Sequence, residues 1–316
     1  MAHEVETMAY ANQVPWHGLG AQVDDSLNAG EFLKAAGLDW TVDLKPLKAD
    51  YDGELIDVPG RYALVRSSDR KVMTVTGQFW KPVQNSEAIG FMQRYVNAGG
   101  AKLETAGSLR GGRYVWGLAK IERQLNIRRN DTINCYLLIV TSHVVGEATK
   151  IKTTTVRVVC ANTMAMAERD GQYAYRQNHL SEFDESAARE AVAAAHEDLD
   201  NAERRAKKID KLKLTVMDAV NKVLVPVMAP EMVEDFTSEQ ELFDAAMNSK
   251  KIEQIVDSIQ NGPGAIPDTG WGVLNGFTHW CDHVQGRGNE SRLFRSWLGD
   301  YSRAKQEVEK KLFEMA

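Results

Sequence analysis

The chain has 316 residues, of which 43% are hydrophobic and 26% are charged. These are ordinary globular values, and they exclude a mostly disordered chain, a collagen and a plain coiled coil. The net charge of −6 hides an uneven distribution: residues 1–60 carry −8, residues 61–180 carry +10 and residues 181–316 carry −8. A basic middle indicates a surface for a polyanion, or else a charge that is balanced by packing against the acidic flanks.

The N-terminal part of the chain alternates between turn signals and short strands. Residues 11–20 are rich in Gly and Pro and are expected to form an irregular segment. Ser26 is expected to cap a short helix that ends at Gly37. Residues 61–66 and 71–76 are predicted strands, because they are rich in β-branched and aromatic residues and are separated by turn residues.

The pattern then changes to a helix and back to strands. Residues 86–98 place apolar side chains at helical spacing and end at two glycines. Residues 112–121 alternate as a strand. Residues 132–141 are apolar on both faces, which predicts a central strand of a sheet. Residues 150–160 are β-branched and are predicted to form a further strand.

After residue 180 the sequence becomes helical. Residues 184–225 contain neither Gly nor Pro, and their apolar residues step by three and four, which predicts one helix longer than ~50 Å. The pair Ser238 and Glu241 is spaced as a capping box and predicts the start of a second helix. A third helix is expected around Trp271 to Val284. Residues 293–315 are expected to form a last amphipathic helix.

These elements predict an α+β fold. The N-terminal half is a mainly antiparallel, sheet-rich region with the long helix packed on it, and the C-terminal part is helical. We therefore expect a core domain over residues 1–180 and a helical region over residues 181–316. The core domain contains the basic residues 61–180, which we call the basic block. The broad apolar face of the last helix must pack on its own chain or on a partner, which predicts a homo-oligomer.

The standard signatures of enzymes are absent from the sequence. It contains no GxxxxGK[ST], GxGxxG, HExxH or GxSxG. Ser68-x-x-Lys71 matches a fragment of a hydrolase motif but lacks its companion motifs. Cys135, Cys160 and Cys281 are widely spaced and form neither a metal knuckle nor a disulfide framework. We therefore expect a protein without a cofactor, a metal or catalytic residues.

Three histidines are the basis for the alternative that the protein binds a metal or catalyses a reaction. His279 and His283 are four residues apart and would share a helix face, a spacing that can bind Zn²⁺. Cys281 would lie on another side of the same helix, so the more ordinary interpretation is a buried cysteine flanked by two histidines. His17 lies in a glycine-bounded loop, where it could shuttle protons or fix the loop through a hydrogen bond to the backbone.

The basic block has features of a nucleic-acid-binding surface. Lys and Arg neutralise phosphates, and aromatic side chains on a sheet face stack with bases. Arg110 and Arg113 enclose two glycines and lead into a strand with Tyr114 and Trp116 on one face. The alternative is a hairpin edge protected by charge, with both aromatic residues in the core. The candidate binding residues are Arg110, Arg113, Tyr114, Trp116, Lys120, Arg128, Arg129, Lys150, Lys152 and Arg157.

Several strings of the sequence together carry a resemblance to a known family. They are PWHGLG at 15–20, AAGLDW at 35–40, AGSLRGGR at 106–113, VRVVCANT at 156–163 and TGWGVLNGFTHWCDH at 269–283. With them the chain resembles the phage/plasmid-like proteins catalogued as domain-of-unknown-function family 932. The resemblance implies a mobile genetic element in the cytoplasm of a bacterial host, and it assigns no catalytic residue.

The expected order of a hairpin-rich sheet followed by a long helix is also similar to phage single-strand annealing proteins, which work without ATP. The leading hypothesis is therefore a protein that binds single-stranded DNA in recombination or replication, by annealing, as a homo-oligomer and without a membrane partner. The second is an interaction protein that binds no nucleic acid, such as an inhibitor of a host defence system. The third is a metal-dependent enzyme acting on nucleotides or nucleic acid through His17, His279 or His283.

Overall fold

The structure is a computed structural model that describes most of the chain. The ranges described are 5–11, 20–24, 26–95, 101–129, 131–157, 162–164, 175–286, 295–296 and 299–316; of residues 95, 154–157, 162–164, 191 and 194–198 only the backbone is described. Nearly all of the irregular segment expected at 11–20, including His17, lies outside these ranges.

The larger sheet has the strand order β10-β9-β8-β7-β6-β1-β2, and β11 also pairs with β9. Its strands are β1 (Val5–Ala11), β2 (Ala21–Val23), β6 (Ala101–Leu109), β7 (Tyr114–Arg128), β8 (Asp131–Ser142), β9 (Ala148–Arg157), β10 (Asn162–Met164) and β11 (Tyr175–Asn178). The pairs β1–β6, β6–β7, β9–β10 and β9–β11 run antiparallel, and β1–β2 runs parallel. The predicted α+β class with a mainly antiparallel sheet is confirmed.

Strand β8 is the central strand predicted over residues 132–141. Its neighbours in the sheet are β7 and β9, and every residue from Cys135 to Val140 is buried. Burial on both faces of a strand requires apolar residues at consecutive positions, which is the pattern that the sequence shows.

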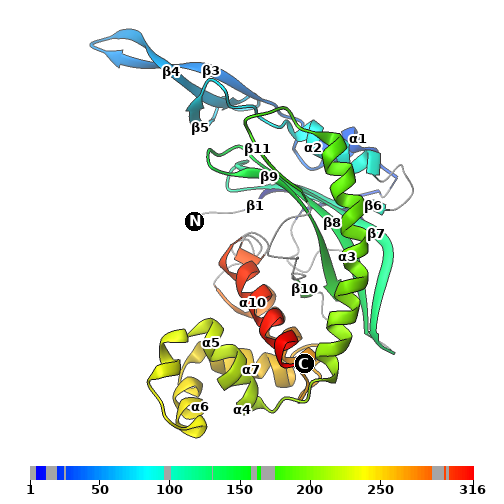
Figure 1. The fold of residues 1–316 in the computed structure, drawn as a ribbon. Coiled ribbons are helices and arrows are strands. Elements are labelled where there is room, and N and C mark those ends of the chain that lie inside the picture. Colours follow the sequence, from blue (N-terminus) through cyan, green and yellow to red (C-terminus); the bar gives the residue numbers. More distant parts are fainter. Residues whose placement is uncertain are drawn as a thin grey trace. The chain divides into compact units, whose positions relative to one another are not determined.

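A second sheet contains β3 (Val42–Tyr51), β4 (Glu54–Arg66) and β5 (Val72–Gly77) in that order. Strand β5 pairs only with the second half of β4, over Arg61–Val65. The rest of β4 pairs with β3 alone, so the two strands continue as a two-stranded ribbon to a turn at Asp52 and Gly53 (Figure 1). The sequence predicted only the half of β4 that has two neighbours.

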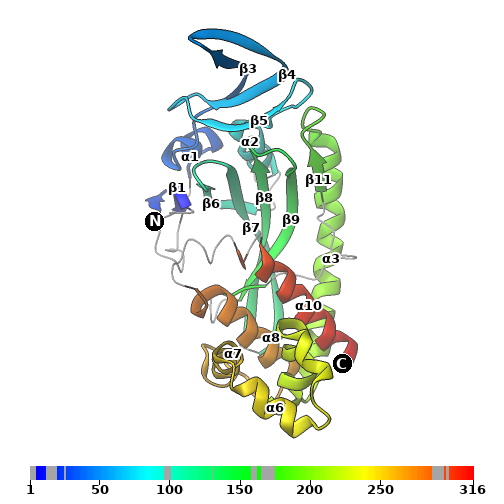
Figure 2. The ribbon, with the colours of Figure 1, turned by 90° about the vertical axis from the view of Figure 1, so that its left-hand side faces the viewer.

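Helices α1 (Ala29–Ala35) and α2 (Asn85–Tyr95) pack on each other beside the second sheet (Figure 2). The predicted cap of α1 is wrong by two residues. Asn28 caps it, because its side chain accepts hydrogen bonds from the backbone N–H groups of Gly30 and Glu31 while the Glu31 side chain accepts from the Asn28 N–H. Ser26 instead donates to Asp24.

The single long helix predicted over residues 184–225 is also wrong. Helix α3 spans Glu185–Lys211 and is followed by an isolated β-bridge between Lys213 and Thr269. Thr215 then caps a new helix, since its hydroxyl accepts from the N–H of Asp218 at 3.1 Å. The sequence contains neither Gly nor Pro at this break, so no local signal marks it. The helix is interrupted by the bridge to a segment more than fifty residues away.

The new helix changes its winding twice before Pro230. Its parts are α4 (Val216–Asp218), the π-helical η3 (Ala219–Leu224), α5 (Val225–Met228) and the 3₁₀-helical η4 (Pro230–Glu234). The cap at Ser238 is confirmed, since its hydroxyl accepts from the N–H of Glu241 at 3.2 Å. The remaining helices are α6 (Glu239–Met247), α7 (Lys250–Asn261), α8 (Gly270–His279), the π-helical η5 (Trp280–Val284) and α10 (Asp300–Met315).

The apolar face of α10 is covered by the chain itself. Tyr301, Val308 and Leu312 are buried, and the helix packs on α8, α5 and η3. This face therefore gives no reason for a homo-oligomer, which stays a prediction. Phe294, Trp297 and Leu298, which were expected to extend the face, lie outside the described ranges.

The chain forms two compact units. The first comprises Met1–Glu122, Tyr136–Thr153 and Tyr173–Ala195, and the second comprises Arg123–Cys135, Thr154–Gln172 and His196–Ala316. Strands β7, β8 and β9 and helix α3 contribute residues to both units. The expected division into domains at residue 180 stays a prediction. Among the helices that the structure describes, none has both the length and the apolar character needed to cross a membrane.

Gly107 of β6 provides a test of the packing in the larger sheet. A Cβ atom at this position would lie 2.3 Å from Cη2 of Trp116 and 2.6 Å from the carbonyl oxygen of Thr7, which belongs to the paired strand β1. We expect Gly107→Ala to lower the free energy of unfolding by about 1–3 kcal/mol, because the strand cannot move away without losing its ladder. Gly77→Ala is the control, since its Cβ would meet nothing within 4 Å. Equal urea midpoints for the two variants would contradict this packing.

Candidate nucleic-acid interface

Two turns of the first unit lie side by side and expose four cations. One turn joins β4 to β5 at residues 67–71, and the other joins β6 to β7 at residues 110–113. The ammonium group of Lys71 donates to the carbonyl oxygen of Gly111 at 3.1 Å, which connects them. The four cations, which we call the basic cluster, are Arg70, Lys71, Arg110 and Arg113, and all four are exposed.

The second turn depends on three consecutive residues with left-handed backbone. Arg110, Gly111 and Gly112 have φ angles of 53°, 65° and 82°. Glycine adopts this conformation without steric conflict, so two glycines in a row explain the GG of the AGSLRGGR string. Gly112 is also a place of close approach, because a Cβ there would lie 2.7 Å from Nη1 of Arg66.

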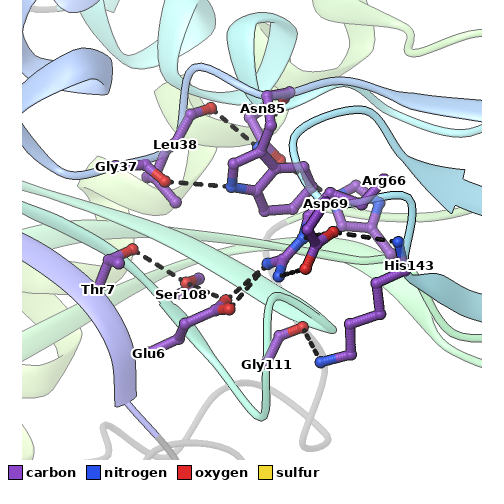
Figure 3. A network of polar contacts seen from close by, with 12 residues as sticks. Glu6, Thr7, Gly37, Leu38, Arg66, Asp69, Asn85, Ser108, Gly111 and His143 are labelled. Carbon is purple, nitrogen blue, oxygen red and sulfur yellow. Dashed lines mark hydrogen bonds and ion pairs between the residues drawn. The ribbon is translucent and has the colours of Figure 1, made fainter.

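Arg66 is the buried ion that both turns share. Its Nε and Nη2 atoms donate to the two carboxylate oxygens of Asp69, at 2.9 and 2.5 Å, within the first turn. Its Nη1 donates to both oxygens of Glu6 on β1, at 2.9 and 2.8 Å (Figure 3). The guanidinium carbon lies 5.2 Å from the ring centroid of Trp40. The side chain of Arg66 is 8% exposed, so the guanidinium is occupied by these partners and is not offered to a ligand.

The contact between Arg66 and Asp69 favours the charged forms of both side chains. The hydrogen bonds that Arg66 donates, first to Asp69 and then to Glu6, raise the pKa of Arg66 above its ordinary value. The hydrogen bond from Arg66 holds the pKa of Asp69 well below its usual range. The guanidinium and the Asp69 carboxylate are therefore charged at neutral pH, and the contact between them does not change with pH there.

A neutral histidine holds the other side of the second turn. The backbone N–H of His143 donates to the carbonyl oxygen of Arg113 at 2.8 Å. Its Nε2 lies 3.0 Å from Oδ1 of Asn85, whose amide nitrogen donates to the carbonyl oxygens of Leu38 and Trp40 at 3.0 and 3.2 Å. Because the amide nitrogen is used in this way, Oδ1 accepts and the His143 proton sits on Nε2. Burial, followed by electrostatic interaction with His179 and Arg66, lowers the pKa of His143 to about 3.

Tyr114 and Lys150 extend the surroundings of the basic cluster. Both contact Glu147: the Tyr114 hydroxyl at 3.5 Å and the Lys150 ammonium at 3.2 Å. Burial and the charge of Glu147 raise the pKa of Tyr114, while the charges of Arg110 and Arg113 act in the opposite direction. Lys150 lies directly opposite the exposed Arg176 in the β9–β11 pair. Two like charges at opposed positions are unfavourable unless anions lie nearby.

Two of the predicted binding residues are buried, and these predictions are corrected. Trp116 is 2% exposed and packs over Gly107, so it belongs to the core and has no face to offer a base. Lys152 is 8% exposed and is not part of a surface. Tyr114 is half-buried. The alternation of the β7 sequence was correct, but both faces of the strand are buried over Val115–Ala119, so alternation there does not tell which face meets water.

The other predicted residues are spread along the strands. Lys120 is half-buried and lies opposite Lys102 in the β6–β7 pair. Arg128 belongs to the second unit, where its Nε donates to Asp210 at 2.6 Å, and Arg129 is exposed in the turn that follows it. The backbone of Arg157 ends β9, and its side chain is not among those described.

Sequence reasoning missed half of the basic cluster. Residues 67–69 were recognised as a turn, but Arg70 and Lys71 were not connected with Arg110 and Arg113. The sequence signal that could have found them is the pair of consecutive cations, Arg70 and Lys71, at a predicted turn within the basic residues 61–180. Arg66 carried no such signal, because its partner Glu6 is 60 residues away.

The histidines of α8 and η5 do not form a metal site with other described side chains. The rings of His279 and His283 lie 5.1 Å apart, as their spacing predicted, and Nδ1 of His279 lies 3.3 Å from the Ser258 hydroxyl. Cys281 is fully buried, which raises the pKa of its thiol. Within the described ranges no group of three or more His, Cys, Asp or Glu residues is placed to hold a metal ion.

Comparison with known proteins gives a family and no function. Residues 72–312 match the family model described as "Domain of unknown function (DUF932)". The chain belongs to this family. The match includes Arg110 and Arg113 and begins just after the turn that holds Arg70 and Lys71. No curated protein and no solved structure matches the chain.

Arg66 provides the test of how the basic cluster is held. We expect Arg66→Gln to lower the free energy of unfolding by about 2–4 kcal/mol, because it leaves the carboxylates of Glu6 and Asp69 without their partner; both are partly exposed, which reduces the loss. Arg66→Lys should recover only part of it, since an ammonium cannot form the two-pronged contact with Asp69. Arg61→Gln, at an exposed position of the same strand, is the control. If Arg66→Gln unfolds at the same urea concentration as the control, the ion group does not hold the turns.

Proposed function

We propose that this protein binds single-stranded DNA through the basic cluster. In this proposal it is encoded by a phage or plasmid and acts in recombination or replication by ATP-independent annealing of single strands. The observation that supports it is the pair of neighbouring turns, which expose Arg70, Lys71, Arg110 and Arg113 and are connected by the Lys71–Gly111 contact. The absence of a nucleotide-binding signature from the sequence is consistent with a process that uses no ATP.

The arrangement favours phosphate as the group that is bound. Arginine presents a planar fork of N–H donors that matches phosphate oxygens, and three of the four cations are arginines. The buried Arg66 and His143 fix the main chain of the turns, so less freedom is lost when the exposed side chains meet a ligand. The core position of Trp116 means that the proposed binding is mainly electrostatic, with the half-buried Tyr114, next to Arg113 in the sequence, as the candidate aromatic contact.

A flexible strand suits this cluster better than a duplex does. Double-stranded DNA is stiff over about 50 nm, and it presents phosphates at fixed spacing. A single strand bends at every nucleotide and can bring several phosphates to one small surface. We therefore expect an oligothymidine to bind more tightly than a duplex with the same number of phosphates.

The salt dependence of oligothymidine binding tests the proposal. Each phosphate contact with a single strand contributes about 0.7 to the slope of log K against log salt concentration, so four contacts give about 2.8. Arg110→Asn and Arg113→Gln should each lower the slope by about 0.7 and weaken binding at low salt. Asparagine is chosen at position 110 because it tolerates the positive φ. The measurement is fluorescence anisotropy at several salt concentrations.

Arg303→Gln is the matched control, because it removes the same charged group from an exposed position on α10. It should leave the slope unchanged. Thermal melts of all variants must show that they are folded. If the variants at positions 110 and 113 bind with the slope of the parent protein, the basic cluster is not the DNA-binding surface.

A further inference from the structure

The ribbon formed by β3 and β4 is exposed along its whole outer part. Every residue from Lys48 to Asp57, which we call the acidic ribbon, is exposed. Among its apolar side chains Tyr51 is 68% exposed, Leu55 is 63% exposed and Ile56 is 46% exposed. A two-stranded ribbon with no third strand or helix against it is of marginal stability in water. Its large apolar side chains therefore indicate a surface that another protein covers.

The charge of the ribbon narrows the chemistry of that partner. The acidic residues are Asp50, Asp52, Glu54 and Asp57, and the only cation in this range is Lys48, which lies 3.4 Å from Asp57. Acidic and apolar residues face each other across the ribbon: Asp50 is opposite Leu55, and Glu54 is opposite Tyr51. Both faces of the ribbon are thus apolar and negative, and the matching surface is apolar and positive.

The first unit carries such a surface at the other end of the same sheet. Strand β5 pairs with β4 on one side, and no other described strand pairs with it. Its Val72 and Val75 are 52% and 44% exposed. Val72 follows directly on the exposed Arg70 and Lys71, and Val75 lies three residues further along the strand. We call these four residues the β5 patch. It combines exposed apolar area with positive charge, which is the chemistry that complements the apolar and negative ribbon.

The ribbon cannot reach the β5 patch of its own chain in this structure. Val42 lies opposite Arg66 at the end of the sheet next to the patch, and Tyr51 lies at the tip. The ten residues of β3 separate these ends by about 30 Å at ~3.3 Å per residue. A contact between the two surfaces therefore requires a second copy of the chain.

We propose that the acidic ribbon of one copy binds the β5 patch of a second copy. The contact joins two different surfaces. It closes as a symmetric dimer where two copies exchange ribbons reciprocally, and it continues into a ring or a filament where each ribbon binds a further copy. The proposal does not depend on DNA binding and is tested without DNA.

Light scattering of the purified chain at low salt measures the assembly. The parent protein should have a mass well above the 35.2 kDa of one copy, and the mass should fall toward that value as salt screens the charges. The double variant Asp50→Lys, Glu54→Lys should be a monomer, because its ribbon repels the β5 patch. A second double variant, Arg70→Asp, Lys71→Glu, should be a monomer for the same reason.

Mixing the two variants gives the decisive result. The positive ribbon of one variant matches the negative patch of the other, and the reverse pair matches as well, so the mixture should assemble as the parent protein does. If the patch variant does not fold, Val75→Asp takes its place as a variant that should not assemble. Leu55→Ser should also lose assembly while it keeps the affinity for oligothymidine, since Leu55 lies outside the basic cluster.

Three outcomes would overturn the proposal: a parent protein that is monomeric at low salt, a ribbon variant that assembles as the parent does, or monomeric variants that stay monomeric when mixed. The last would mean that the ribbon meets a different surface or a different protein. Because oligothymidine binding is measured separately, a failure of assembly leaves the proposed DNA binding standing, and a failure of DNA binding leaves the assembly standing.

Discussion

The contact of Arg66 with two carboxylates is the interaction on which the candidate site depends. One guanidinium group holds Asp69 in the turn before β5 and Glu6 on β1, and it lies against Gly112 in the turn before β7. A buried charge of this kind is costly unless every partner is in place, so the two turns and β1 are fixed together or not at all. The exposed cations Arg70 and Lys71 follow Asp69 directly, and Arg110 and Arg113 flank the two glycines. Their positions are a consequence of this one buried ion.

The first unit also carries a negatively charged surface, the acidic ribbon, in addition to the basic cluster. The acidic ribbon and the turn that holds Arg70 and Lys71 are close in the sequence, yet the length of β3 separates that turn from the tip of the ribbon. The acidic ribbon lies within the negative residues 1–60, and the basic cluster lies within the positive residues 61–180, at turns of two different sheets. One of them suits a polyanion and the other suits a positive protein surface. A ribbon that binds protein and a cluster that binds DNA can thus belong to one molecule. Because the β5 patch shares Arg70 and Lys71 with the basic cluster, a ribbon and a DNA strand compete for these two side chains.

The sequence was informative where a structure depends on local pattern. The apolar run of β8, the cap at Ser238 and the buried Cys281 were all predicted from residues within a few positions of each other. One error arises from contact between distant segments, because the bridge from Lys213 to Thr269 ends a helix that has no local stop signal. The error at the cap of α1 is local, since Asn28 forms the complete capping box and Ser26 bonds to Asp24. The candidate site shows the same division: Arg110 and Arg113 were found beside their glycines, whereas the role of Arg66 depends on Glu6, and the burial of Trp116 depends on Gly107 and β1.

Hydrogen–deuterium exchange with and without oligothymidine tests the central claim most directly, because it locates the binding surface without a substitution. The account predicts slower exchange of the backbone amides in residues 67–72 and 109–114 together, since one strand contacts both turns, and unchanged exchange in helices α6 and α7. Slower exchange in only one of the two turns, or protection confined to the helices of the second unit, would contradict the account.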